Sequence, residues 1–397
     1  MISSLFYVLF FIPVWVILYV RKLITGKSMW IWDDVLLAYG RTMSVHYFNS
    51  KSYFLRQMGL LPYVFDDQMD LVGVSIRNPE DSLLRESPIW KAKPGIFHLW
   101  FIRSSLRIAH QGRDEVDIEY LEHKSLSYDL LLILKTIPAL LFHFEGAVEE
   151  TQVDLLGVHF YNIDMKQALG MIDERISSNM TENVFFINAD CLNKTVSDPE
   201  YKQILQSTDL VFPDGSGINL ACNMIGKPLK GNINGTDMFP LLCELAQEKG
   251  YKLFFLGAKP GIVEKMAGLL LTKYPELNIC GYRNGYFDWQ SQSQEVVQEI
   301  NQSGADILFV AFGAPLQEKW IQMNAPSLNT RINLGVGGLF DFYSDNIPRA
   351  PRWMRDLGIE WVYRLIQEPR RMWKRYILGN PLFLYRVYRW NRTQRKR

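Results

Sequence analysis

The sequence predicts an α/β fold built on a parallel sheet, and three observations support this prediction. Short apolar runs alternate with segments of helical period between about residues 153 and 345. Several of these runs end in turns that contain glycine or proline, as buried strands commonly do. The chain has 397 residues, of which 48% are hydrophobic and 21% charged, so it can form two domains with sizeable cores. Strand–helix alternation at this spacing is typical of a parallel sheet.

The elements of this α/β segment follow one another in a regular order. Each apolar run precedes a stretch whose apolar residues recur with the helical period. The expected strands are residues 183–188, 209–212, 251–256, 306–311 and 331–336, and the expected helices are residues 164–178, 198–207, 236–249, 261–273 and 293–303.

An uncharged apolar segment occupies residues 5–20 and is followed directly by Arg21 and Lys22. As a straight helix it would be about 24 Å long, shorter than a hydrocarbon core of about 30 Å. Pro13 would also kink it. Two interpretations remain open: a short membrane-spanning helix, and a re-entrant helix that bends at Pro13 and returns. In both, the basic pair places the following chain on the cytoplasmic side.

The charge distribution indicates a class of binding partner, and the cysteines argue against two kinds of site. Residues 349–397 contain 14 Lys/Arg and 3 Asp/Glu, although the whole chain has a net charge of +1. A basic end implies an anionic partner, which could be phosphates, nucleic acid or a membrane surface. No CxxC pair occurs, so the cysteines indicate buried free thiols in a reducing compartment rather than a zinc site or a disulfide framework. They are Cys191, Cys222, Cys243 and Cys280.

Three motifs lie between residues 21 and 150: MDLVG (69–73), KPGIFHLW (93–100) and DIEYLEHKSLSYDLLLILKT (117–136). Together with the start around Pro13, they resemble the bacterial sugar transferases that move a sugar phosphate onto polyprenyl phosphate. That family carries a catalytic Asp-Glu pair before the LVG motif, whereas residues 41–58 contain no acidic residue. Ser and Asn do not replace a nucleophilic carboxylate and its magnesium-binding neighbour. We therefore expect residues 1–145 to be a degenerate, inactive relative that serves membrane attachment or lipid presentation.

The stretch STDLVFPDGSG, residues 207–217, ends a predicted strand with Asp214 between a proline and two glycines. A carboxylate at a strand end, where glycines allow close approach, is well placed for chemistry. Taken alone, the Asp-Gly pair more often indicates a turn or a helix cap. The loops at residues 257–261 and 313–318 suit phosphate oxygens at helix starts. No Walker lysine and no GxGxxG occurs, which disfavours an ATPase or a dinucleotide enzyme.

Eight motifs in this order carry a second resemblance: FFINADCLN, LVFPDGSGINLA, GNINGTDMFP, FFLGAKPGIVEKM, YPELNICGYRNGYF, LFVAFGAPLQEKWI, LGVGGLFDFYSDNIPRAPRWM and GIEWVYRLIQEPRRMWKRY. From about residue 153 to 376 the chain resembles the WecG/TagA/CpsF family of glycosyltransferases. The resemblance implies a Rossmann-like fold over residues 153–345, and a helical basic appendage over residues 346–397 that completes the active site and contacts membrane. It also implies inverting transfer of an N-acetylmannosamine-type sugar or related hexose from a UDP-sugar to a polyprenyl-diphosphate-linked acceptor.

The same resemblance assigns roles to individual residues. Asp214 matches the general base, which removes the proton of the attacking acceptor hydroxyl. Phe186 departs from the threonine common at its position. Asn234 has the alternative role of a helix cap, and Glu318 that of an acid favoured by a helix dipole. The matching substrate-binding residues are Asn188, Asn234, Gly235, Thr236, Asp237, Gln317, Glu318, Arg349, Arg364 and Arg371.

The arginines of the appendage can neutralise a UDP leaving group in the role that a divalent cation plays elsewhere. We therefore expect neither a metal nor a cofactor. Apolar positions at helical spacing, such as Trp361, Leu365, Trp373 and Ile377, favour a cationic helix on an anionic bilayer over nucleic-acid binding. From Arg386 onward the arginines are expected to contact lipid or solvent.

The leading hypothesis is thus a glycosyltransferase of surface polysaccharide biosynthesis at the cytoplasmic face of a bacterial inner membrane. Its expected partners are a UDP-sugar, a polyprenyl-diphosphate-linked acceptor and membrane lipids, but no nucleic acid. Self-association and contacts with other polysaccharide-assembly proteins remain open. Two alternatives remain: a bifunctional enzyme that also transfers sugar phosphate to polyprenyl phosphate, and a non-catalytic membrane scaffold.

Overall fold

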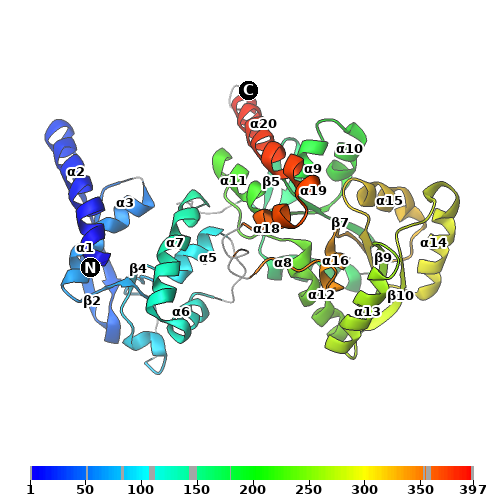
Figure 1. Cartoon of the computed structure of the whole chain (residues 1–397), viewed down its shortest axis with the longest axis horizontal. Coiled ribbons are helices and arrows are strands. Elements are labelled where there is room, and N and C mark those ends of the chain that lie inside the picture. Colours follow the sequence, from blue (N-terminus) through cyan, green and yellow to red (C-terminus); the bar gives the residue numbers. More distant parts are fainter. Residues whose placement is uncertain are drawn as a thin grey trace. The chain divides into compact units, whose positions relative to one another are not determined.

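The computed structural model describes residues 2–50, 52–81, 85–106, 112–142, 150–178, 180–351, 354 and 359–394. The chain divides into two compact units, residues 1–145 and 146–397, which are described separately (Figure 1).

The first unit begins with a continuous helical segment made of α1 (Ile2–Phe6), a π-helical turn (Tyr7–Phe11) and α2 (Ile12–Thr25). Pro13 lies at the start of α2, directly after the π turn, where the regular hydrogen-bond ladder is already interrupted. The helix therefore continues past Pro13 to Thr25 and is longer than the predicted segment. By length and composition alone, Ser3–Thr25 could cross a membrane.

The rest of the first unit is a small mixed body with two two-stranded sheets. One sheet is antiparallel and the other parallel. The strands are β1 (Trp30–Leu36), β2 (Thr42–Phe48), β3 (Asp70–Val72) and β4 (Gly95–Phe97); the helices are α3 (Tyr53–Gln57), α4 (Leu61–Phe65), α5 (Leu99–Leu106), α6 (Arg113–His123) and α7 (Leu126–Phe142), with 3-10 turns at Ala38–Gly40, Met58–Leu60 and Pro88–Lys91.

A buried polar cluster fixes α6 inside this body. The Asp117 carboxylate accepts hydrogen bonds of 2.6 Å from Ser75 Oγ and from Arg77 Nη2. The Tyr120 hydroxyl donates to the Val72 carbonyl at 3.0 Å. Both carboxylate oxygens of Asp117 are hydrogen-bonded, which offsets part of the cost of burying its charge. These motif residues therefore have structural roles within the unit.

The second unit is organised around a six-stranded sheet of order β10-β9-β11-β12-β7-β8, in which every pairing is parallel. A separate antiparallel hairpin precedes it. The hairpin strands are β5 (Gln152–Leu155) and β6 (Val158–Tyr161), and the sheet strands are β7 (Glu182–Ile187), β8 (Leu210–Pro213), β9 (Lys252–Gly257), β10 (Asn278–Arg283), β11 (Ile307–Ala311) and β12 (Ile332–Gly335).

Helices surround this sheet (Figure 1), and a buried cluster lies on each of its faces. Successive side chains of a strand point to opposite faces. Phe185 and Ile187 accordingly belong to one cluster, and Val184 and Phe186 to the other. The helices are α8 (Met165–Ser177), α9 (Ala189–Lys194), α10 (Pro199–Ser207), α11 (Ser216–Ile225), α12 (Gly235–Lys249), α13 (Ile262–Lys273), α14 (Trp289–Ser303), α15 (Leu316–Asn324) and α16 (Leu339–Tyr343), with a 3-10 turn at Ala325–Ser327.

The basic C-terminal segment belongs to the same compact unit. It consists of α18 (Glu360–Gln367), α19 (Pro369–Trp373), a π-helical turn (Lys374–Leu378) and α20 (Gly379–Gln394). Phe383 and Val387 of α20 are fully buried in one of the two sheet-face clusters. Arg386 donates to the side-chain oxygen of Asn193 at 2.7 Å. The expectation that Arg386 contacts only lipid or solvent is therefore wrong, because α20 packs on the protein.

The Rossmann-like parallel sheet and its accompanying helices confirm the predicted fold class, and all five expected strands are present within two residues. Strand β10 was not expected. It is a sheet edge with a polar sequence and a register shift between Ile279 and Gly281, so it lacks the apolar run of a buried strand. Cys280 in this edge strand is only partly buried, whereas the other three cysteines are buried and free, as expected.

Candidate active site

Asp214 follows β8 at the carboxyl end of the sheet. Its backbone N–H donates to the Ile187 carbonyl at 2.8 Å, which aligns the ends of β7 and β8. Gly215 follows with φ 91°, a left-handed conformation that glycine adopts without strain. The surrounding protein removes water from the carboxylate, and this desolvation raises the pKa of Asp214 to about 6. Asp214 is therefore mostly ionised at pH 7 and close to the pKa that suits a general base.

Asn188 ends β7 beside Asp214. Its side-chain oxygen accepts from the backbone N–H groups of Asp190 and Cys191, both at 3.1 Å, and so caps α9. Its amide group also bonds to the Asp214 carboxylate, which lowers the pKa of that carboxyl against the larger effect of desolvation. Asn188 thus connects the start of α9 to the candidate base.

The loop before α12 has the cap that the sequence allowed. The Asn234 side-chain oxygen accepts from the Asp237 N–H at 2.7 Å, and its amide donates to the Asp237 carboxylate at 2.7 Å. Arg349 also donates to Asp237. A Cβ built on Gly235 would lie 3.2 Å from the Phe186 ring, so the glycine makes room for that ring. The Thr236 carbonyl accepts from the Tyr343 hydroxyl at 2.8 Å.

Gln317 connects the loops that follow β11 and β12. Its side-chain oxygen accepts from the backbone N–H of Gly313 at 3.1 Å and from that of Gly337 at 2.8 Å. Its amide donates to Glu318 at 3.0 Å. Glu318 is fully buried at the start of α15, and desolvation raises its pKa to about 7. The pair therefore holds two loops at the same edge of the sheet as Asp214.

The three predicted arginines take different positions. The Arg364 guanidinium lies 4.7 Å from the centre of the Phe342 ring, and a Cβ on Gly338 would lie 3.3 Å from its Nη2. Arg349 bonds Asp237, as described above. The Nε atoms of Arg349 and Arg364 are buried and have no hydrogen-bond partner among the described residues. The Arg371 side chain is instead 69% exposed and pairs with Glu368 at 3.1 Å.

All predicted site residues except Arg371 thus belong to loops or helices at the carboxyl edge of four neighbouring strands, β8, β7, β12 and β11. Parallel α/β sheets bind ligands at this edge. The site combines two carboxyl groups of raised pKa, Asp214 and Glu318, with backbone N–H groups and guanidinium groups. This set can deprotonate a hydroxyl and bind an anion. Among the described residues, no group of three His, Cys, Asp or Glu side chains is arranged to hold a metal ion.

Three residues at this site were missed by sequence reasoning. Asp190 forms ion pairs with Lys194 at 2.8 Å and with Arg375 at 3.6 Å. Lys194 also donates to the Ala314 carbonyl at 2.8 Å, in the loop after β11. On a continuous helix Arg364, Arg371 and Arg375 would share one face. In the structure α18 ends before α19, Arg371 is exposed beside Glu368, and Arg375 lies against Asp190.

Residues 153–397 match the profile described as "Glycosyl transferase WecG/TagA/CpsF family". Three similar proteins share the name N-acetylglucosaminyldiphosphoundecaprenol N-acetyl-beta-D-mannosaminyltransferase. That of Bacillus spizizenii W23 is 34% identical over 51% of this chain and 77% of its own length, and that of Bacillus subtilis 168 is 32% identical over 52% and 77%. The protein of Staphylococcus aureus MW2 is 29% identical over 62% of this chain and 95% of its own length.

Proposed function

Because the chain belongs to the WecG/TagA/CpsF family of glycosyltransferases, we propose that it transfers a sugar from a UDP-sugar to a polyprenyl-diphosphate-linked acceptor. An N-acetylmannosamine-type sugar and a lipid-linked N-acetylglucosamine are the first substrates to consider, since they appear in the relatives' name. The observation that carries the proposal is Asp214, a carboxylate with a pKa of about 6 at the ligand-binding edge of the sheet.

The proposed reaction is a single displacement with inversion at the anomeric carbon. The acceptor hydroxyl oxygen attacks that carbon, the bond from the carbon to the UDP oxygen breaks, and the hydroxyl proton passes to Asp214. UDP leaves with the electron pair of the broken bond. The carboxylate must be ionised before the reaction, so activity should fall as the pH decreases through about 6.

The departing diphosphate carries the charge that develops in this displacement. The Nε of Arg364 is buried and has no hydrogen-bond partner among the described residues. The Nε of Arg349 also makes no hydrogen bond there, but it lies 3.6 Å from Glu360 Oε1. Guanidinium groups pair well with phosphate oxygens. The loops held by Gln317 lie at the neighbouring strand ends. With these groups to receive the charge, we propose a reaction that needs no metal ion.

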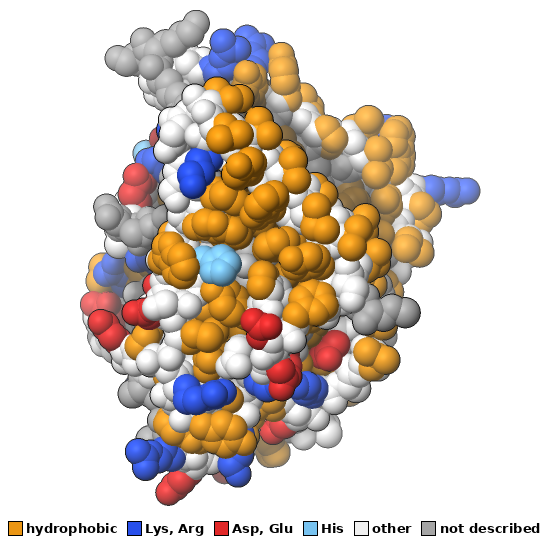
Figure 2. Space-filling model, turned by 90° about the vertical axis from the view of Figure 1, so that its left-hand side faces the viewer, with side chains coloured by type: hydrophobic (Ala, Val, Ile, Leu, Met, Phe, Trp, Pro, Cys, Tyr) orange, Lys and Arg blue, Asp and Glu red, His pale blue; other side chains and the backbone are white. Residues whose placement is uncertain are grey.

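The acceptor lipid requires access to a membrane, and the first unit offers an apolar surface for it (Figure 2). Helix Ser3–Thr25 exposes apolar side chains, among them Val16, Ile17 and Leu23 at 47%, 65% and 69%. Its opposite side packs on the folded body, from the Phe6–Phe97 ring contact at 5.2 Å to the hydrogen bond from Arg21 to the Asn49 carbonyl at 3.1 Å. Protein covers one side of this helix along its length. Such a helix is better suited to lie embedded in one face of a membrane than to cross the membrane. Arg21 and Lys22 favour the cytoplasmic face.

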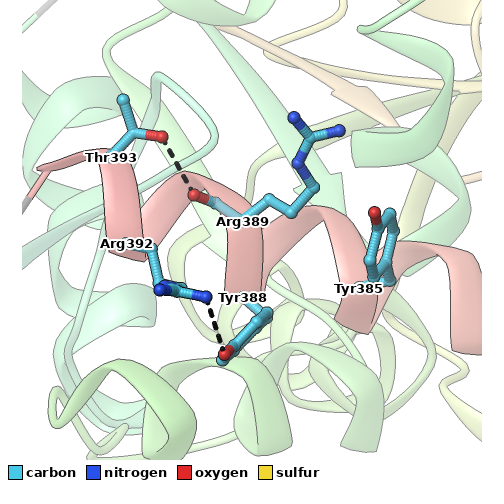
Figure 3. A pocket seen from close by; sticks show the side chains of 5 residues that line it. All are labelled: Tyr385, Tyr388, Arg389, Arg392 and Thr393. Atoms are coloured by element: carbon cyan, nitrogen blue, oxygen red, sulfur yellow. Dashed lines mark hydrogen bonds between the residues drawn. The ribbon is translucent and has the colours of Figure 1, made fainter.

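Helix α20 offers a second, cationic surface (Figure 3). Tyr385, Tyr388, Arg389 and Arg392 line a pocket along it, and Arg392 donates to the Tyr388 hydroxyl at 3.4 Å. Tyrosine and arginine side chains together are typical of the interface of an anionic bilayer. We assign no catalysis to residues 1–145, because the acidic pair of the sugar-phosphate transferases that they resemble is missing.

The test is UDP release from a panel of UDP-N-acetylhexosamines with detergent-solubilised polyprenyl-diphosphate N-acetylglucosamine as acceptor. Substituting Asp214→Asn should lower turnover by about 10²–10⁴-fold, the usual contribution of a general base. The matched control is Asp288→Asn, at an exposed helix cap that asparagine serves equally well. Unchanged turnover in Asp214→Asn would refute the assignment of the base. Lipid binding without UDP release from any donor would instead favour the non-catalytic scaffold. Release of UMP from a UDP-sugar in the presence of polyprenyl phosphate would favour the bifunctional enzyme.

A further inference from the structure

Arg375 of the C-terminal segment lies against α9, although it comes 161 positions after Asp214 in the chain. It is part of the π turn Lys374–Leu378 between α19 and α20. Its Nε lies 3.6 Å from Asp190 Oδ2. This Nε is buried and has no hydrogen-bond partner among the described residues. The guanidinium therefore lies at the start of α9, shortly after the end of β7, with donor capacity still unused.

The three charged groups and one amide that act on Asp214 come from four parts of the fold. Glu360 of α18 and Asp237 of α12 repel its negative charge, while Asn188 at the end of β7 donates a hydrogen bond to it. Arg375 of the π turn is the cation whose attraction favours the ionised form, and its effect on the pKa is the largest after desolvation. Without this cation, burial and the two neighbouring acids would raise the pKa of Asp214 further.

The position of Arg375 is set by contacts on both sides of it. Asp190 is shared between Arg375 and Lys194, and Lys194 is bound to the Ala314 carbonyl. After the π turn, the Gly379 carbonyl accepts a hydrogen bond of 2.8 Å from the Asn193 amide. Asp190 and Asn193, the residues that contact the C-terminal segment, both lie on α9. The helix capped by Asn188 therefore also holds Arg375 in place.

We propose that Arg375 is a positioning residue that keeps Asp214 ionised and oriented for proton removal from the acceptor. The inference rests on the proposed function, in which Asp214 is the base. It assigns to the C-terminal segment a role distinct from binding the diphosphate: control of the protonation state of the base. Arg375 touches neither substrate nor reacting atoms in this role and acts only through Asp214 and Asp190.

The test is the pH dependence of UDP release by the full-length protein in detergent, for wild type, Arg375→Gln, Arg375→Lys and Arg370→Gln. Removing an adjacent opposite charge raises a carboxyl pKa by about one unit or more. Arg375→Gln should therefore lose about fivefold in kcat at pH 6 and little at pH 8.5. Arg375→Lys should restore much of the loss at pH 6. Arg370→Gln, at an exposed arginine of α19, should leave the profile unchanged.

A uniform loss at every pH, or an unshifted profile, would overturn the proposal, since a purely structural role would lower activity without moving the acidic limb. The proton affinity of Asp214 can also be followed by carboxyl ¹³C NMR, which needs no turnover. If wild type releases no UDP, the proposed function fails. In that case, a higher titration midpoint of Asp214 in Arg375→Gln than in wild type would by itself support the charge coupling. Equal midpoints in the two proteins would reject it.

Discussion

Replacing Gln317 with methionine tests the connection between the two loops. Methionine has a similar length but no amide, so Gly313 and Gly337 lose the acceptor that they share at 3.1 and 2.8 Å. Each buried N–H left without a partner costs about 1–3 kcal/mol. Both glycines are partly exposed, so we take the lower end, about 2 kcal/mol for the two together.

The assay is amide hydrogen exchange followed by mass spectrometry on peptides that cover residues 311–317 and 335–339. A loss of about 1 kcal/mol at each amide corresponds to about fivefold faster exchange of each one. Peptides from β9 should exchange as in the wild type and serve as the internal control. The KM for the UDP-sugar should rise more than kcat falls, because the loops are proposed to bind the donor. Unchanged exchange in both loops would refute the reasoning that the Gln317 side chain holds them.

Three further predictions concern stability, docking and membrane attachment. Burial raises the pKa of Glu318 from 4.5, its value in the unfolded chain, to about 7. The protonated carboxyl therefore contributes its full stabilisation to the fold below pH 4.5. This stabilisation is lost as the pH rises through about 7. Glu318→Gln should thus melt higher than wild type at pH 8, with the difference shrinking toward pH 5 in a thermal scan. Asn193→Ala removes the hydrogen bonds to Gly379 and from the Arg386 guanidinium, so limited proteolysis should cut the segment after residue 367 faster than in wild type, whereas equal cutting would contradict the docking. Ile17→Lys places a charge on an exposed apolar position and should reduce sedimentation with anionic vesicles, whereas a lysine at the exposed Val196 of the second unit should not.

Much of the second unit was predictable because its information is local. Buried parallel strands appear as short apolar runs, and the turns after them carry glycine or proline. The helix cap at Asn234 was also predictable, since it depends on residues three positions apart. The hairpin β5–β6 and the edge strand β10 were not expected, because half-exposed strands have no such runs. The first helix continues past Pro13 after a π turn, and no local sequence pattern predicted that turn.

The sequence by itself therefore determined the parallel sheet, the family and the position of Asp214 at a strand end. Only the tertiary structure decided which distant side chains surround that carboxylate. Arg371 and Arg375 are four residues apart in one basic run, yet one is exposed beside Glu368 and the other lies against Asp190. The physical reason is packing, because contacts with α9 select Arg375 to face the protein and leave Arg371 in solvent. Local composition does not encode that selection, because it depends on packing between segments more than 150 residues apart.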